Sequence, residues 1–336
     1  LSPKEYGLVG MIMIFIAICQ VFIASGFGAA LIRKKNCTQA DYSTVFYYNL
    51  AISILLYLVL FFSAGLIADF FSEPLLVPII RVLGIEIIFD ASNIIQKTIL
   101  TKRVDFKLQT RISVISSVLS GIVGIVMAYS GFGVWSLVVK MVLTSFIPAV
   151  LLWIWNAWRP SLVFSIQSFK ELFGFGSKLL ISGLIDTLYR NVYLVIIGKY
   201  FSAESLGYYT RADQFRNFPS HSVSNIIGRV SFPVLSNIQE DKVLLKAAYK
   251  RLIKSTMLIT FVLMLGMAGL SKSMILVLLG DKWLMTAEYL ELLCISGMLY
   301  PLQVLNLNML NVSGRSDLFL RLEIIKKSLA IPTIII

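Results

Sequence analysis

Charged residues are scarce in this sequence. They make up 14% of its 336 residues, whereas hydrophobic residues make up 57%; a soluble domain carries roughly 25% charged residues. Apolar runs long enough to cross a bilayer recur along the whole chain and leave no stretch for a sizeable soluble domain. The composition therefore excludes a water-soluble protein and predicts an all-α polytopic membrane protein.

Cysteine and histidine are also rare. Cys19, Cys37 and Cys294 lie far apart, without the spacing of a disulfide framework or a zinc site. His221 stands alone, which favours a satisfied polar residue over a metal ligand or a proton relay. Motifs for phosphate binding, nucleophilic catalysis or metalloproteolysis are missing too. Because the predicted outer loops are short, we expect a transporter without a cofactor or metal, and a membrane-embedded sugar polymerase is a minor alternative.

Acidic residues are outnumbered, since 30 Lys and Arg against 18 Asp and Glu give a net charge of +12. The basic residues are scattered between apolar runs and form no basic face with interleaved aromatics, so they do not indicate a nucleic-acid partner. They follow the loops instead: the loops near 33–35, 102–107, 159–170 and 242–254 are basic, and those between them are neutral or acidic. By the positive-inside rule, the basic loops are cytoplasmic.

A helix needs roughly 20 apolar residues to cross the hydrocarbon core. By this criterion we expect about ten spans, near 6–32, 42–67, 75–99, 109–130, 134–156, 174–198, 205–235, 255–279, 284–311 and from about 320. The chain opens on Leu1 rather than Met, in a segment typical of a loop, and closes within an apolar run. We therefore expect a fragment of a longer protein, with an odd number of spans, most simply one, before Leu1.

Two short similarities recur in the same order along the chain. The segment 1–8 resembles 201–208, and 103–108 resembles 315–320, each pair on one predicted side of the membrane. Ordered recurrence predicts an internal repeat. We therefore expect two pseudo-symmetric transmembrane helix bundles around a central cavity. The first bundle covers 1–158, a cytoplasmic connector covers 159–173, and a second bundle covers 174–336.

Several segments carry a family resemblance over the whole sequence: LSPKEYG at 1–7, GFGVWSLV at 131–138, IGK at 197–199, LGYYTRAD at 206–213 and VSFPVLS at 230–236. In these the chain resembles the lipopolysaccharide, O-antigen and capsule polysaccharide flippases, in the superfamily that also holds multidrug extruders and lipid II flippases. The resemblance implies two six-helix bundles in a bacterial inner membrane. It also implies that the protein moves an undecaprenyl-pyrophosphate-linked oligosaccharide across that membrane and contacts the membrane lipids. An ion-coupled multidrug or toxin antiporter of the same superfamily is the alternative.

Ionisable residues at membrane depth usually face a wet path or a partner. In the span near 75–99, Glu86, Asp90, Asn93 and Lys97 have the spacing that places them on one helical face. We interpret Glu86 and Asp90, with Lys97, as a site that binds a coupling ion, H⁺ or Na⁺. The alternative is a structural network held by Lys97 or by a neighbouring helix.

Arginines occupy the two spans after the connector. Asp186 and Arg190 have the i, i+4 spacing of an ion pair, and Arg211 and Arg229 share a broad face of the next span. The planar fork of arginine suits a pyrophosphate, so we expect Arg190, Arg211, Arg229 and Asp186 to contact the cargo. The alternatives are an ion pair that neutralises itself and arginines that extend to opposite membrane interfaces.

Overall fold

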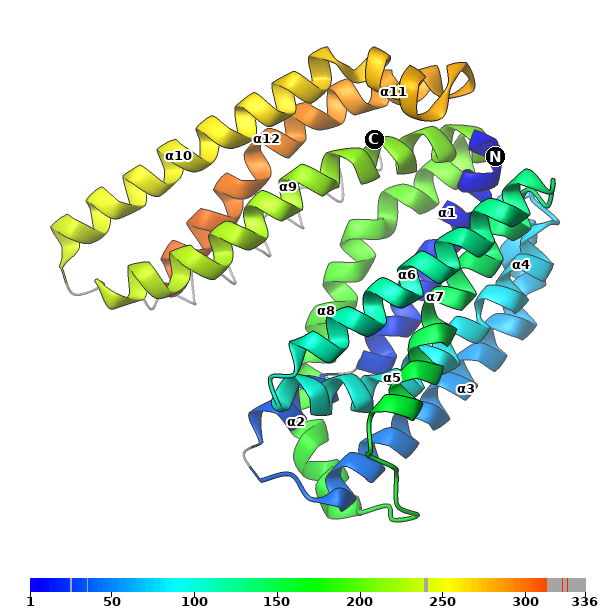
Figure 1. Ribbon diagram of the computed structural model, residues 1–336, viewed down its shortest axis with the longest axis vertical. Coiled ribbons are helices and arrows are strands. Elements are labelled where there is room, and N and C mark those ends of the chain that lie inside the picture. The colour runs from blue at the N-terminus through cyan, green and yellow to red at the C-terminus, as the bar shows by residue number, and fades with distance from the viewer. Residues whose placement is uncertain (25, 35, 239–240, 313–321, 323–324, 326–336) are drawn as a thin grey trace. The chain divides into compact units, whose positions relative to one another are not determined.

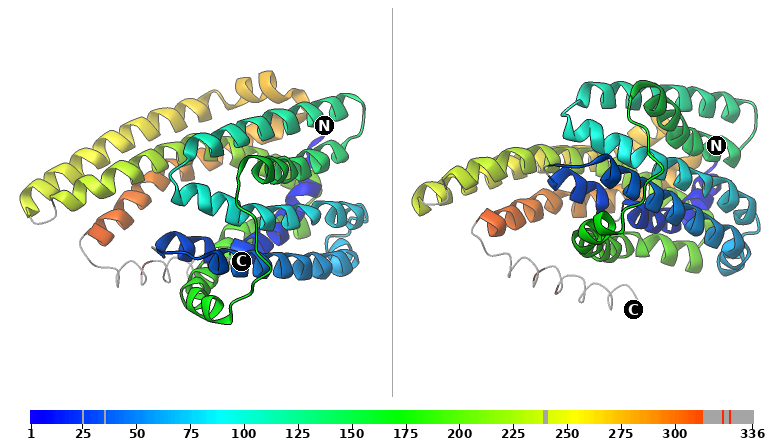
Figure 2. Two further views of the ribbon diagram at one scale, coloured as in Figure 1. Left: turned by 60° about the horizontal axis from the view of Figure 1, so that its bottom comes forward. Right: turned by 90° about the horizontal axis from the view of Figure 1, so that it is seen from below.

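The computed structural model describes residues 1–24, 26–34, 36–238, 241–312, 322 and 325. Every regular segment in that part of the chain is a helix (Figures 1 and 2). The helices are α1 (Pro3–Ala24), α2 (Phe27–Arg33), α3 (Gln39–Phe71), α4 (Leu76–Leu83), α5 (Ile85–Lys102), α6 (Phe106–Tyr129), α7 (Val134–Trp155), α8 (Ile166–Tyr200), α9 (Ala203–Asn237), α10 (Lys242–Gly269), α11 (Ser271–Leu279), the 3₁₀ turn η1 (Asp281–Trp283) and α12 (Leu284–Val312).

Within the described part of the chain, six helical segments are long and apolar enough to cross a membrane: Pro3–Arg33, Gln39–Phe71, Phe106–Tyr129, Val134–Trp155, Leu179–Tyr200 and Lys242–Gly269. The other described segments predicted as spans, near 75–99, 205–235 and 284–311, are also helical. Two causes are visible: α4 has only 8 residues, and α5 and α9 each carry several charged residues. The chain is thus a multi-span α-helical protein, as the composition predicts.

Two predicted spans are broken where glycine allows a close approach. Between α1 and α2, Gly26 has φ +68°, and a Cβ there would lie 2.7 Å from the backbone oxygen of Gly176. Between α4 and α5, a Cβ on Gly84 would lie 2.9 Å from the Tyr57 ring. The Tyr57 hydroxyl donates a hydrogen bond to the Arg81 carbonyl at 3.2 Å, so a neighbouring helix satisfies a backbone group near the break.

Two stretches predicted as loops are helical instead. The helix α8 begins at Ile166, inside the predicted connector 159–173. Its N-cap is Ser165, whose side chain accepts a hydrogen bond from the Ser168 amide. The helix α10 begins at Lys242, inside the predicted basic loop, after Asp241 accepts from two amides of the first turn. A hydropathy window detects only the apolar part of a helix, so it missed these polar, capped first turns. The connector is therefore irregular only over 156–165.

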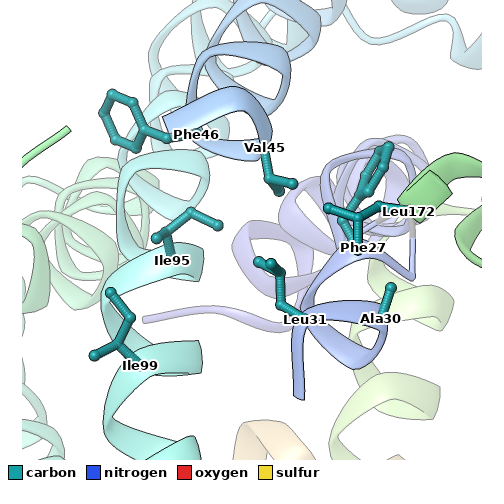
Figure 3. Close-up of a cluster of buried hydrophobic side chains, with 8 residues drawn as sticks. All are labelled: Phe27, Ala30, Leu31, Val45, Phe46, Ile95, Ile99 and Leu172. Atoms are coloured by element: carbon teal, nitrogen blue, oxygen red, sulfur yellow. The ribbon is translucent and has the colours of Figure 1, made fainter. Parts of the chain in front are cut away.

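A cluster of buried side chains joins four helices (Figure 3). Phe27, Ala30 and Leu31 come from α2, Val45 and Phe46 from α3, Ile95 and Ile99 from α5, and Leu172 from α8. Aromatic rings of the same helices surround it, with Phe27 edge-on to Tyr48 at 5.0 Å. Dispersion contacts of this kind hold helices together where lipid offers the same apolar surroundings.

Contacts divide the chain into two compact units, Leu1–Leu206 and Gly207–Ile336. The helix α8, predicted to open the second bundle, packs on α1 and α3 and so lies in the first unit. In the second unit α10 and α12 lie side by side (Figure 1), and Tyr208 of α9 meets Trp283 edge-on at 6.1 Å.

The first proposed repeat pair has matching local structure. Ser2 and Ser202 each precede a helix, and each hydroxyl accepts the amide hydrogen of the residue three positions later, at 3.4 and 3.0 Å. Both segments therefore begin helices in the same way. In the second pair, Asp105 caps α6 through the Leu108 amide, whereas 315–320 lies outside the described residues. The pseudo-symmetry, the bundle boundaries and the central cavity stay predictions.

Candidate functional site

The polar face of α5 is formed as predicted, and α1 and α7 meet it. Glu86 is 4% exposed and Asn93 is buried. The Gln20 amide of α1 donates to Asp90 Oδ2 at 3.3 Å, and the Asn93 amide donates to the Ser145 carbonyl of α7 at 3.1 Å. Lys97 makes no ion pair with Glu86 or Asp90, both of which are described. Neighbouring helices, rather than Lys97, therefore supply the contacts of this face.

Glu86 lines a cavity of ≈ 660 Å³ inside the first unit. Five helices build it, with α1, α6, α7 and α8 joining α5. Its polar lining comprises Gln20, Glu86, Ser117, Ser120, Lys140, Thr144, Ser145 and Asn191, and its apolar or small lining comprises Met13, Ile16, Ala17, Gly121 and Met141. Polar groups from five otherwise apolar helices converge here, which is typical of a solute path or an ion site.

A second hollow of ≈ 500 Å³ adjoins the cavity, because Ser117 and Thr144 line both. It brings in Lys97 at the far end of the α5 face and Gln109 of α6. Hydroxyl groups link the helices along it: Thr144 donates to Ser120 Oγ at 3.1 Å, and Ser116 donates to the Thr144 carbonyl at 3.2 Å. We call the side chains that line these two hollows the polar wall of the first unit. It extends from Glu86 to Lys97, two ends of one helical face.

The residues of the polar wall that escaped the sequence reasoning include Gln20, Lys140 and Asn191. Lys140 carried a signal, since a lysine seven residues into an apolar span is as unusual as Glu86. Its stem lies against Gly124, whose Cβ would approach Lys140 Cβ to 3.1 Å. Gln20 and Asn191 carried none, because uncharged amides are common in membrane helices and only packing decides which of them meet.

The ion pair predicted on α8 is present. Arg190 Nε lies 2.8 Å from Asp186 Oδ2, and both side chains are about half exposed. This spacing follows from the helical repeat alone. Arg190 lies in the first unit with the rest of α8, whereas Arg211 lies in the second unit.

The arginines of α9 have separate surroundings. Arg211 donates to Gln214 Oε1 at 2.7 Å, a contact along the predicted face. Arg216, on the other side, is 2.5 Å from Asp213 and also donates to Asn217 and to Ser296 of α12. This second group is a packing contact between α9 and α12, since Gly297 admits the Arg216 stem. The side chains of Arg229 and His221 lie outside the described residues.

The described residues hold no group of three His, Cys, Asp or Glu side chains placed to bind a metal ion. The three cysteines are free; Cys19 and Cys294 are buried and Cys37 is half-buried. The site is therefore characterised by hydroxyl, amide, lysine and carboxylate groups.

A family profile described as "Polysaccharide biosynthesis protein" matches residues 1–288. The chain belongs to this family. The predicted resemblance to polysaccharide flippases is thereby confirmed at the level of the family, and the chain is a multi-pass membrane protein of a polysaccharide biosynthesis and export transporter family. The prediction of a transporter rather than an enzyme agrees with this membership.

Three curated relatives illustrate the family. The teichuronic acid biosynthesis protein TuaB of Bacillus subtilis is 30% identical over 89% of this chain and 62% of its own length. The succinoglycan biosynthesis transport protein ExoT of Rhizobium meliloti is 26% identical over 90% and 61%. The lipopolysaccharide biosynthesis protein WzxC of Escherichia coli is 25% identical over 100% and 69%. The chain thus spans about three fifths of the first two relatives.

Among solved structures, a multidrug resistance MATE family transporter of the MOP superfamily in an inward-facing conformation matches with a TM-score of 0.69. The match covers 97% of this chain and 81% of the transporter, at 16% sequence identity. At this identity the likeness concerns the fold. It confirms the predicted all-helical, multi-span fold.

Proposed function

We propose that the protein flips an undecaprenyl-pyrophosphate-linked oligosaccharide across the bacterial inner membrane, for assembly of an O-antigen, capsule or exopolysaccharide. Family membership supports a role in polysaccharide export. The relatives' names mention three different polymers. Cargoes with different sugars can share the same lipid carrier. We therefore propose that the protein recognises the pyrophosphate of this carrier in every cargo.

The observation that carries the proposal is the polar wall of the first unit. It sets Lys97 and Lys140 beside serine, threonine and amide groups within helices that are otherwise apolar. A diphosphate needs positive charge wherever it leaves water, and sugar hydroxyls need donors and acceptors. The polar wall offers both.

We assign Arg190, Arg211 and Arg229, with Asp186 as the partner of Arg190, to further contacts along the cargo's path. Arg190 is half exposed and paired to an acid on its own helix, so it can exchange that partner for a phosphate without leaving a buried charge unpaired. Several moderate contacts suit transport better than one tight site, because a deep site would hold the cargo.

We also assign Glu86 and Asp90 to coupling by H⁺ or Na⁺, with Lys97 as the cation at the other end of their helical face. The buried Glu86 carboxyl has no hydrogen bond or ion pair to another described residue, and it faces the cavity. A carboxyl so placed is available to an ion.

The direct test is complementation. A bacterial strain that lacks its own O-antigen flippase would receive the full chain with a matched polysaccharide gene cluster. We expect surface polysaccharide to return and the lipid-linked precursor to disappear from the cytoplasmic leaflet. Precursor that persists despite normal amounts of protein in the membrane would refute the proposal.

An ion-coupled multidrug antiporter is the second candidate, favoured by the fold likeness and by the buried Glu86. The same strain distinguishes the two functions. An antiporter would raise resistance to cationic drugs without restoring polysaccharide. The flippase would restore polysaccharide without changing drug resistance.

A further inference from the structure

A small pocket apart from the polar wall lies at the helix ends that the charge pattern assigns to the cytoplasm. Its volume is ≈ 270 Å³, and its lining residues are Cys37, Gln39, Tyr42, Ile99, Lys102, Arg103 and Trp158. They come from the segment before α3, the first turns of α3, the end of α5 and the connector after α7. Three chain segments far apart in sequence thus build one pocket, next to the core cluster that shares Ile99 (Figure 3).

The pocket carries positive charge without an acid in its lining. The Lys102 ammonium is held in place by the Leu31 carbonyl at 3.2 Å, the Lys34 carbonyl and the Cys37 sulfur at 2.8 Å. These partners are uncharged, so its charge is not neutralised. The nearby acids are engaged elsewhere: Asp41 pairs with Lys34, and Asp105 caps α6.

Arg103 differs from Arg111 and Arg159, two other arginines at these helix ends. Arg111 stacks on Trp155 at 4.7 Å, and Arg159 donates to the Asn156 and Trp158 carbonyls. Arg103 is exposed, and it has no hydrogen bond or ion pair to any described residue. Its planar fork is therefore available for an oxyanion that enters the pocket.

The aromatic wall of the pocket is fixed before any ligand arrives. Trp158 Nε1 donates to Gln39 Oε1 at 2.8 Å, and the Gln39 amide donates to the Arg159 carbonyl at 2.6 Å. The Trp158 carbonyl accepts from the Gln96 amide at 3.2 Å. Tyr42 meets the Trp158 ring edge-on at 6.2 Å. Pre-organisation of this kind lowers the entropy lost on binding.

We propose that this pocket binds the phosphate group of a lipid headgroup at the membrane surface, with Arg103 as the direct ligand and Lys102 as the fixed charge. The volume matches roughly nine waters at about 30 Å³ each. A pocket of this volume accommodates a phosphate or diphosphate with the chemical group attached to it, and it is too small for an oligosaccharide. The headgroup belongs either to a resident anionic phospholipid or to a lipid-linked diphosphate; the second source rests on the proposed function.

Lipid binding to the purified full chain tests the pocket. The probes are phosphatidylglycerol and undecaprenyl diphosphate, titrated in mixed micelles and counted by native mass spectrometry, with phosphatidylcholine as the baseline. We expect Arg103→Gln to weaken binding about tenfold, the effect of losing one charge-assisted contact. Arg103→Lys should be intermediate, because it keeps the charge and loses the fork. The matched control is Lys107→Gln, which removes an exposed charge from the same region outside the pocket lining.

The outcomes separate the two sources and the two proposals. Loss of phosphatidylglycerol binding in Arg103→Gln supports a phospholipid site, and selective loss of undecaprenyl diphosphate supports a cargo-docking site. Equal binding by Arg103→Gln and Lys107→Gln, at equal thermal stability, overturns the inference. Complementation by the same variants is scored separately. Flipping with no binding difference refutes the pocket alone, whereas binding without any flipping by the wild type refutes the proposed function alone.

Discussion

Individual side chains differ in how much their neighbours constrain them. Arg216 is fixed by Asp213, Asn217 and Ser296, and its loss would act on packing. Glu86 lies beside a cavity without a described polar partner, and Arg190 has one partner on its own helix. Residues of the second kind can change partners during a transport cycle, so predictions about function belong to them.

Glu86 and Asp90 provide the test of ion coupling. If Glu86 exchanges the coupling ion, Glu86→Gln should abolish the dependence of flipping on pH and on sodium. Asp90→Asn should weaken it less, because Asp90 already accepts a hydrogen bond from Gln20. Initial flipping rates across pH and sodium gradients measure this, with the exposed Asp69→Asn as control. Wild-type dependence in both variants would favour the structural network.

Arg190, Arg211 and Arg229 should show a graded effect. Lysine keeps the charge and loses the bidentate geometry, whereas glutamine loses both. We expect Gln to reduce flipping more than Lys at each position, by roughly tenfold for Gln if one charge-assisted contact is lost. Surface polysaccharide in the complemented strain, at matched protein levels, measures it. Full activity of the triple Gln variant would rule out a path along these arginines.

At the scale of helices, ion pairs and glycines fix how the ends meet. Lys34, between α2 and α3, lies 3.1 Å from Asp41 of α3 and 3.0 Å from Glu171 of α8. The hydrogen bond to Glu171, followed by that to Asp41, raises the pKa of Lys34. A raised folded-state value means that the pair's stabilisation is complete below about pH 10.4, the ordinary lysine value, and is lost as the pH rises through the folded value.

Removing the cation and removing the exposed acid of this group should have unequal costs. Lys34→Met leaves the Asp41 carboxylate buried without its cation and should cost about 1–3 kcal/mol. Glu171 is exposed, so Glu171→Gln should cost only about 0–1 kcal/mol. Apparent unfolding midpoints in detergent at a fixed scan rate measure both costs. At strongly alkaline pH, the wild type should lose its advantage in midpoint over Lys34→Met. An equal effect of the two substitutions would contradict this assignment.

Gly26 and Gly65 form a second matched pair. Alanine at Gly26 must adopt φ +68°, which costs about 1–2 kcal/mol, and its Cβ would meet the Gly176 backbone, which cannot turn aside. A Cβ at Gly65 meets nothing within 4 Å, so Gly65→Ala should stabilise α3 by about 0.5–1 kcal/mol. The midpoints should therefore shift in opposite directions. A harmless Gly26→Ala would show that the break between α1 and α2 does not depend on this glycine.

At the scale of the whole molecule, orientation in the membrane is the open prediction. Loop charges place Lys34 and Lys246 in the cytoplasm and Glu73 and Lys282 in the periplasm. Single cysteines at these four positions, with the three native cysteines replaced, would be labelled in intact cells by an impermeant thiol reagent. Only the latter two should react. The reverse pattern would overturn the orientation and, with it, the cytoplasmic position of the Arg103 pocket.

The sequence by itself determined the features that depend on a local repeat or on solvent. Hydropathy alone predicts a multi-span helical protein, because the bilayer forces backbone groups to pair within each segment. Helical spacing alone predicts the Asp186–Arg190 pair and the shared face of Glu86 and Asn93, because neighbours along a helix are fixed by its turn.

Only the tertiary structure decided which helices meet. Gln20, Lys140 and Asn191 join Glu86 because α1, α7 and α8 line one cavity with α5, and no local pattern encodes such packing. Likewise, Arg103 and Trp158 line one pocket although 55 positions of sequence separate them. Between membrane helices, association depends on side-chain fit, since lipid offers the same apolar surroundings to every face. Fit of this kind is a property of several helices together, so a single segment of sequence does not reveal it.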